Sequence, residues 1–199
     1  MITVISKNYY APPVNQKEIL RYAGAKEINT ITEKLLNDLY KEFSESAVYR
    51  VCYAELPINI TDDICDFSVF SFKSKDLAKN LKNAKRVILF AATIGIGVDR
   101  LINKYSKISP LKSVLTDAIG SERIEALCDK FCEDIKLEYG NLKPRFSAGY
   151  GDLSIESQSE IFALLKCDKN IGLTLNDSYI MSPSKSVTAF IGIEEFYEF

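Results

Sequence analysis

The sequence predicts a single α+β domain over residues 1–199. Segments with helical spacing of apolar residues alternate with short strand-like segments, and no repeat, linker or low-complexity tract separates them. The hydrophobic content of 47%, with 26% charged residues, is typical of a globular chain large enough to bury a core. No apolar run approaches the roughly 20 residues that span a bilayer, so we expect no membrane segment.

The first elements predicted are two helices. Asn15, with Glu18 three residues later, matches the start of a capped helix, which should end at Gly24. Apolar residues then recur at helical spacing from about residue 29 to residue 43, which predicts a second helix with one buried face.

The next segments favour strands. Residues 47–56 alternate between two sets of side chains, which predicts a strand, and residues 66–72 alternate similarly. Ser74 is placed to cap a short helix that runs to about residue 82. The apolar run 86–92 is typical of a strand buried on both faces.

Gly95 and Gly97 follow this buried strand and open a helix, as the glycine turn of a dinucleotide-binding fold would. The third glycine of that fingerprint is absent, since Arg100 stands in its place. Two interpretations remain: a structural turn that brings helix and strand together, or a ligand-facing loop. An ordinary methyltransferase with a parallel sheet is therefore one alternative.

The second half of the chain begins with a long helical pattern over residues 110–138. A break at Gly120–Ser121 would divide it into two helices, because the serine is followed by glutamates typical of a helix start. After Gly140 the chain resembles a loop until residue 156, where a helix to residue 165 follows. A strand over residues 186–193 completes the domain.

Composition excludes several kinds of chemistry. The chain contains no histidine, which removes Ser-His-Asp and Cys-His catalytic sites and histidine-ligated metals, and we expect no metal site. The net charge of −2 does not favour nucleic acid or an anionic membrane. Residues 1–7 are too short and polar for a secretory signal, so we expect a cytoplasmic protein whose five cysteines are free thiols.

Residues 144–152 form the first candidate binding segment. Arg145 can hold a carboxylate through two hydrogen bonds, and Gly149 and Gly151 let the backbone approach a ligand and expose N–H donors. Tyr150 adds a flat aromatic face. The alternative is a surface turn with a solvated arginine.

Two segments together carry a resemblance to a known family. They read Arg145-x-x-x-Gly149-Tyr150 and Met181-x-Pro183-x-Lys185-Ser186-Val187. This combination resembles the activation domain of cobalamin-dependent methionine synthase, the module that binds S-adenosylmethionine, and most closely its small free-standing versions. The resemblance extends to residues 93–95 and 117–121, and it implies a curved mixed or antiparallel sheet flanked by helices.

The resemblance also implies a binding site. Arg145 would hold the carboxylate of S-adenosylmethionine, and backbone groups around Ser147 and Gly149 would hold the nucleoside and tail. Tyr150 would lie near the methyl group and against the incoming corrinoid. Glu125 is the best match for the acid that binds the ammonium group.

The function implied is that of a reactivation subunit. When cob(I)alamin on a methionine synthase is oxidised to cob(II)alamin, a flavodoxin-like donor reduces it and S-adenosylmethionine methylates it. Because the chain has no histidine to coordinate cobalt, cobalamin is expected to arrive on a partner: a methionine synthase or another corrinoid protein.

The sequence departs from the fused domains at two places. Ile191 lies near the position of a ligand-contacting tyrosine, and Ser157-Gln158-Ser159 replaces their His-Thr-Glu stretch. A non-catalytic module that docks on a corrinoid protein is therefore the alternative function.

Overall fold

The centre of the structure is a four-stranded antiparallel sheet. The computed structural model describes residues 2–25 and 30–194. The strands lie in the order β1 (Ile5–Tyr9), β2 (Tyr49–Pro57), β6 (Arg86–Thr93) and β9 (Ser186–Ile193). Every neighbouring pair is antiparallel. The predicted α+β class is confirmed, and the methyltransferase alternative is wrong because it needs a parallel sheet.

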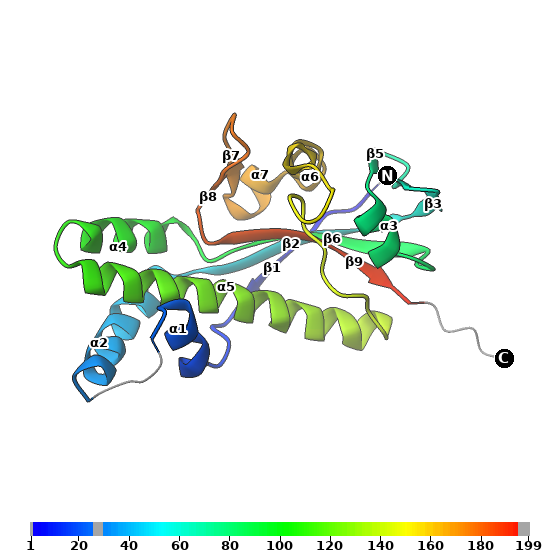
Figure 1. Cartoon of the computed structure of the whole chain (residues 1–199). Coiled ribbons are helices and arrows are strands. Elements are labelled where there is room, and N and C mark those ends of the chain that lie inside the picture. Colours follow the sequence, from blue (N-terminus) through cyan, green and yellow to red (C-terminus); the bar gives the residue numbers. More distant parts are fainter. Residues whose placement is uncertain (1, 26–29, 195–199) are drawn as a thin grey trace.

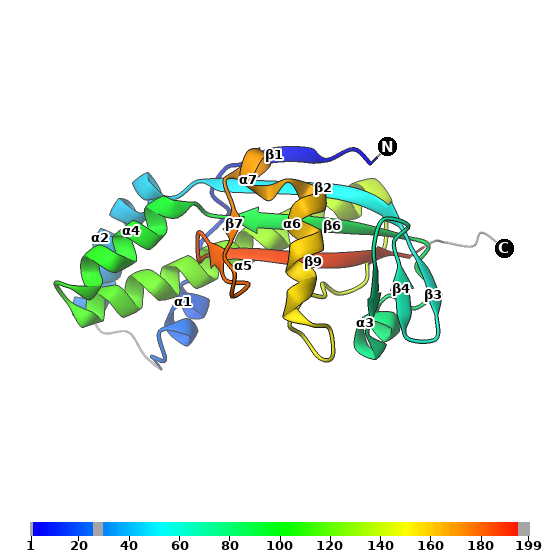
Figure 2. The same ribbon diagram turned by 90° about the horizontal axis from the view of Figure 1, so that it is seen from above.

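Helices and small strands cover both faces of this sheet (Figure 1). On one face lie α1 (Gln16–Tyr22), α2 (Thr30–Ser46) and α5 (Pro110–Tyr139), with α4 (Ile96–Ser106) beside α5. The other face carries α3 (Lys75–Asn80), the 3-10 turn Ile155–Ser157, α6 (Gln158–Leu165) and α7 (Cys167–Ile171). Seen from above, α6 and α7 lie across the strands (Figure 2).

Two short sheets complete the second face. One consists of β3 (Asn59–Thr61), β4 (Ile64–Asp66) and β5 (Ser71–Lys73). The other pairs β7 (Thr174–Leu175) with β8 (Met181–Ser182).

The covering of both faces explains why residues 87–92 of β6 are all apolar. Ile88 and Phe90 belong to the core beneath α2 and α5, whereas Val87 and Leu89 belong to the core beneath α3, α6 and α7. Successive side chains of a strand point to opposite faces, so a strand between two cores needs apolar residues at every position.

Helix α1 begins as predicted, but only half of the expected capping box forms. The Asn15 side chain accepts a hydrogen bond from the N–H of Glu18, at 3.3 Å. The N–H of Asn15 donates to Glu122 of α5, at 3.0 Å, instead of to Glu18. The cap therefore also fastens the N-terminal segment to α5.

Helix α5 is continuous, so the break considered at Gly120 is absent. A Cβ on Gly120 would lie 3.1 Å from the side chain of Lys185, which shows that the glycine makes room for this lysine. Ser121 does not begin a helix; its hydroxyl donates to the carbonyl of Asp117 one turn earlier.

The strand predicted over residues 66–72 is wrong. The chain turns there between β4 and β5, and Ser68 has a φ of 67°. Its N–H donates to the Asp66 carboxylate at 2.8 Å, an arrangement typical of a tight turn. The apparent alternation came from Phe70 and Phe72, whose rings pack against Phe67.

The Gly95 and Gly97 turn is structural. A Cβ on Gly95 would lie 2.4 Å from Val48, and one on Gly97 would lie 2.2 Å from the carbonyl oxygen of Ser46. The two glycines therefore let the start of α4 pack against the end of α2.

Two further expectations concern cysteines and membranes. All five cysteines are free thiols, as predicted, and Cys132 alone among them is partly exposed. Among residues 2–25 and 30–194, none of the helices combines the length and apolar character that crossing a bilayer requires.

Candidate functional site

The candidate site lies where one face of α5 meets the edge strand β9. Asp117, Ser121, Glu125 and Asp129 recur every four residues, which places them along one side of the helix. Two cations reach this row: Lys185, which directly precedes β9, and Arg145, whose segment pairs with β9 at Phe190. Each of them contacts two members of the row.

Lys185, immediately before β9, makes the first set of contacts. Its ammonium lies 2.8 Å from the Asp117 carboxylate and 3.0 Å from the Ser121 hydroxyl. Since the Lys185 side chain is only 15% exposed, these contacts hold the start of β9 against α5.

Arg145 makes the second set. Its Nη2 donates to Glu125 at 3.1 Å and to Asp129 at 2.9 Å. The segment that carries Arg145 is held to β9 by a pair of backbone hydrogen bonds between Phe146 and Phe190, at 2.9 and 2.8 Å. The structure thus brings together Arg145 and Glu125, which are 20 residues apart.

Arg145 retains unused binding capacity. Its Nη1 is buried, and no described residue accepts a hydrogen bond from it. Burial alone would lower the pKa of Arg145, but nearby acidic groups, Glu125 and Asp129 among them, raise it above its ordinary value. The guanidinium is therefore charged, and an unpaired buried donor of this kind is costly until an acceptor binds.

The other predicted residues lie on the loop that follows. The N–H of Gly149 donates to the Leu153 carbonyl at 2.9 Å, and the N–H of Tyr150 donates to the Ser147 carbonyl at 3.2 Å. These two N–H groups are used within the loop, so the expectation that Gly149 exposes its donor is wrong. The loop instead presents Tyr150, whose side chain is 68% exposed.

Asp152 anchors this loop to the start of α3. Its carboxylate accepts hydrogen bonds from the Ser74 hydroxyl at 2.5 Å and from the N–H groups of Lys75 and Asp76. The bond from Ser74, followed by that from Lys75, holds the pKa of Asp152 below its ordinary value. Gly151 is required here, because a Cβ would lie 2.2 Å from the Asp76 carboxylate.

Ile191 is 1% exposed and lies in the core beneath α5, so its side chain does not reach the surface.

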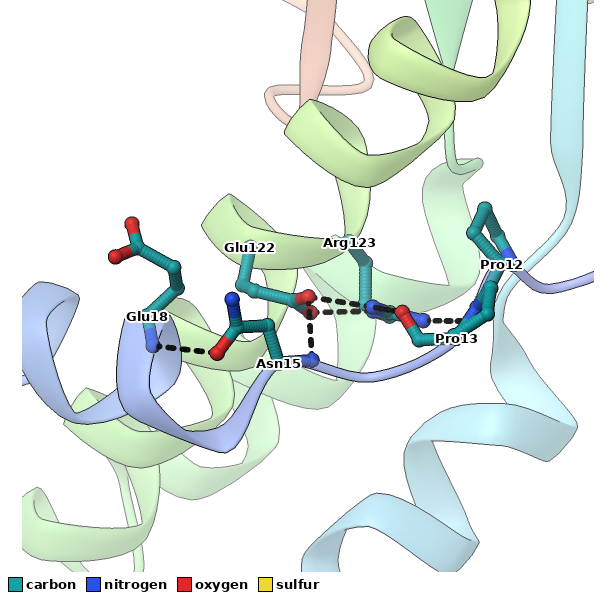
Figure 3. A network of polar contacts seen from close by, with 6 residues as sticks. All are labelled: Pro12, Pro13, Asn15, Glu18, Glu122 and Arg123. Carbon is teal, nitrogen blue, oxygen red and sulfur yellow. Dashed lines mark hydrogen bonds and ion pairs between the residues drawn. The ribbon is translucent and has the colours of Figure 1, made fainter. Parts of the chain in front are cut away.

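A buried ion pair forms the neighbouring wall (Figure 3). Arg123 donates from Nε and Nη2 to the Glu122 carboxylate, both at 2.5 Å. It also donates to the carbonyls of Pro12, at 2.5 Å, and Pro13, at 2.7 Å. A cavity of about 370 Å³ lies beside this network, with Glu125 and Asp129 among its lining residues.

Sequence reasoning missed Asp129 and the buried pair. The spacing of four between Glu125 and Asp129 was a usable signal for the former. Nothing in the sequence distinguishes the buried Arg123 from an exposed helical arginine.

Comparison with known proteins agrees with this architecture. A crystal structure described as the MetH reactivation domain bound to AdoHcy superposes with a TM-score of 0.71 and covers 98% of this chain and 81% of that one. The sequence identity is 15%, so the likeness defines the fold. No curated protein matches the chain.

The family assignment comes from the sequence model of one family. Residues 75–196 match the activation domain of vitamin B12-dependent methionine synthase. The chain therefore belongs to this family, and the resemblance carried by Arg145–Tyr150 and Met181–Val187 is confirmed.

Proposed function

We propose that this chain binds S-adenosylmethionine at Arg145 and acts as a free-standing reactivation subunit for a separate cobalamin-bearing methionine synthase. The observation that carries the proposal is the buried Nη1 of Arg145, which has no acceptor within residues 2–25 and 30–194 and lies beside Glu125 and Asp129. An amino-acid group carries one carboxylate and one ammonium, and this arrangement offers one cationic donor and two anions to receive them.

Each residue of the proposed site has a separate task. Arg145 binds the carboxylate through Nη1, and Glu125 accepts the ammonium. The outer edge of β9 at residues 186–189 receives no backbone hydrogen bond from another described segment, which leaves main-chain groups for the nucleoside. Tyr150 presents an aromatic face that attracts a cationic centre and contacts the corrinoid partner.

S-adenosylmethionine, when bound, supplies an electrophilic methyl group on a sulfonium. The protein's contribution is to orient that group and to exclude water, because methyl transfer to cobalt involves no proton transfer. The absence of histidine from the chain is compatible with such a site, and it favours cobalamin held by the partner. The resemblance to the activation domain implies that a flavodoxin-like donor reduces this cobalamin.

The second candidate function is a docking module that caps a corrinoid protein without productive ligand binding. The buried position of Ile191 favours it, since a ligand contact of the fused domains has no counterpart there. Binding of a corrinoid protein without turnover of S-adenosylmethionine would distinguish this function from the first.

The proposed function is tested by reductive methylation. Cob(II)alamin on a candidate synthase is mixed with reduced flavodoxin, S-adenosylmethionine and the protein, and methylcobalamin is followed by its absorbance. We expect formation with the wild type and with the matched control Arg100→Ala, whose arginine is exposed, but not with Arg145→Ala. Equal formation with and without the protein would contradict the proposal.

A further inference from the structure

A second cavity, of about 800 Å³, lies on the other face of the sheet from α1 and α5. Helix α3 and the β3–β4 hairpin gather at one end of the sheet (Figures 1 and 2). The cavity is lined by residues of these two elements and of the segments next to them. It shares no lining residue with the cavity beside Glu125 and Asp129. The cavity is therefore separate from the site proposed for S-adenosylmethionine.

One wall of this cavity is basic. Lys75 and Lys79 lie one turn apart on α3, and Lys82 and Lys85 come from the turn that joins α3 to β6. None of the four ammonium groups forms an ion pair with another residue of the described chain. Four ammonium groups without ion pairs among the described residues therefore surround one hollow, although the net charge of the protein is −2.

The opposite wall does not neutralise this charge. Asp62 and Asp63 also line the cavity, so four positive charges face two negative ones. Asp63 additionally lies 3.8 Å from Lys73, which is outside the cavity. The cavity consequently retains a positive potential that favours an anion.

The floor of the cavity is apolar. Ile58, Ala78 and Ala84 line it and are 6%, 8% and 6% exposed. An inorganic ion would leave this surface uncovered, whereas a ligand with an apolar body would cover it. Ligand sites commonly combine an apolar lining with a few polar groups, in cavities of about 300–1,000 Å³.

We propose that this cavity binds a small organic phosphate, with the phosphate groups among the lysines and the apolar body on the floor. Lysine binds phosphate as a compact point charge that needs no fixed geometry, which suits side chains from a helix and a turn. The same contacts predict that binding weakens as salt concentration rises.

The test is a calorimetric titration with ATP as the probe. The double variant Lys79→Glu and Lys82→Glu reverses two charges of the cavity, and Lys34→Glu with Lys41→Glu reverses two exposed charges on α2 as a matched control. We expect the cavity variant to bind about tenfold more weakly or worse, which corresponds to at least about 1.4 kcal/mol, and the control to bind as the wild type does.

Three results would overturn the proposal: no binding of ATP at millimolar concentration, equal losses in both double variants, or adenosine binding as tightly as ATP. If the charge reversals prevent folding, Lys79→Gln with Lys82→Gln provides the same comparison with a smaller expected loss.

Two further ATP titrations distinguish the cavity from the site at Arg145. Arg145→Ala is expected to leave ATP affinity unchanged, and S-adenosylmethionine, which carries no phosphate, is expected not to displace ATP. Loss of ATP binding in Arg145→Ala would place ATP at the other site and overturn the cavity assignment. Normal ATP binding without S-adenosylmethionine binding would refute only the proposed function.

Discussion

Two arginines contact acidic residues of α5, and they differ in how completely they are paired. Arg123 is 0% exposed, and its Nε, Nη1 and Nη2 all donate to protein oxygens. Arg145 is also largely buried, yet its Nη1 has no acceptor among the described residues. Protein acceptors therefore satisfy every nitrogen of the Arg123 guanidinium, whereas Arg145 keeps one donor that can bind a ligand.

The acidic partners show the same contrast. Glu122 is 4% exposed and accepts hydrogen bonds from both Arg123 and Asn15, so its charge is wholly supported by the protein. Glu125 and Asp129 are 44% and 68% exposed at their side chains. Water can replace their contacts with Arg145, so the cost of removing this arginine should fall on binding and not on folding.

The largest expected effect comes from breaking the buried ion pair between Arg123 and Glu122. Arg123→Ala removes all four hydrogen bonds of the guanidinium and leaves Glu122 as a buried, uncompensated charge. We expect the free energy of unfolding to fall by about 3–5 kcal/mol, as measured by urea denaturation. Arg100→Ala serves as control and should change it by less than about 0.5 kcal/mol. Equal stability of the two variants would contradict the account of Arg123.

The next largest effect is on S-adenosylmethionine affinity, and it distinguishes Glu125 from Asp129, the two acids beside Arg145. Glu125→Gln is expected to weaken S-adenosylmethionine binding about tenfold, since it removes the charge that receives the ammonium. Asp129→Asn should weaken it much less, because the exposed carboxylate is screened by water. Calorimetric titration of both variants measures the difference. A larger loss in Asp129→Asn would reassign the ammonium contact to Asp129.

A smaller effect concerns the loop after Arg145, which Asp152 fastens to α3. Its pKa is lowered in the folded protein, so its contribution to stability is present above the ordinary aspartate pKa and is lost as pH falls through the lowered value. We expect Asp152→Asn to lower the melting temperature at pH 7 and to lower it progressively less as pH falls towards 3. A difference that stays constant with pH would show that the Asp152 charge does not anchor the loop.

The smallest effect concerns the thiols near Arg145. Burial raises the pKa of Cys132 to about 11, although the charge of Arg145 acts to lower it. Thiolate is therefore scarce at pH 8 and increases only as pH approaches this value, so we expect slow reaction of Cys132 with iodoacetamide in the native protein. Denaturant should expose the Cys132 thiol and accelerate the reaction. Rapid alkylation of the native protein at pH 8 would show that this region is more open than described.

The elements that sequence reasoning identified are those whose pattern is local. The apolar run 86–92 and the strand 186–193 have side chains suited to one structure in any context, and they form β6 and β9. Strand β1 was not predicted, because Ile5–Tyr9 is an exposed edge segment that becomes a strand only by pairing with β2.

The candidate site divides in the same way. Arg145, Gly149 and Tyr150 were found because they are close in sequence. The burial of Ile191 was missed because it depends on the core beneath α5, which the residues around it in sequence do not reveal. Gly120 was misinterpreted as a helix break because its role also depends on a distant residue. It makes room for Lys185, which lies 65 residues later in the sequence.

The most direct test of the difference between the two arginines is to measure affinity and stability together on Arg145→Ala. S-adenosylmethionine is titrated calorimetrically into the wild type, Arg145→Ala and Arg100→Ala, and urea denaturation is recorded on the same preparations. We predict that Arg145→Ala loses about 1.5–3 kcal/mol of binding free energy and less than about 1 kcal/mol of stability. Unchanged binding, or a loss of stability as large as that of Arg123→Ala, would contradict the assignment of Arg145 as the ligand clamp.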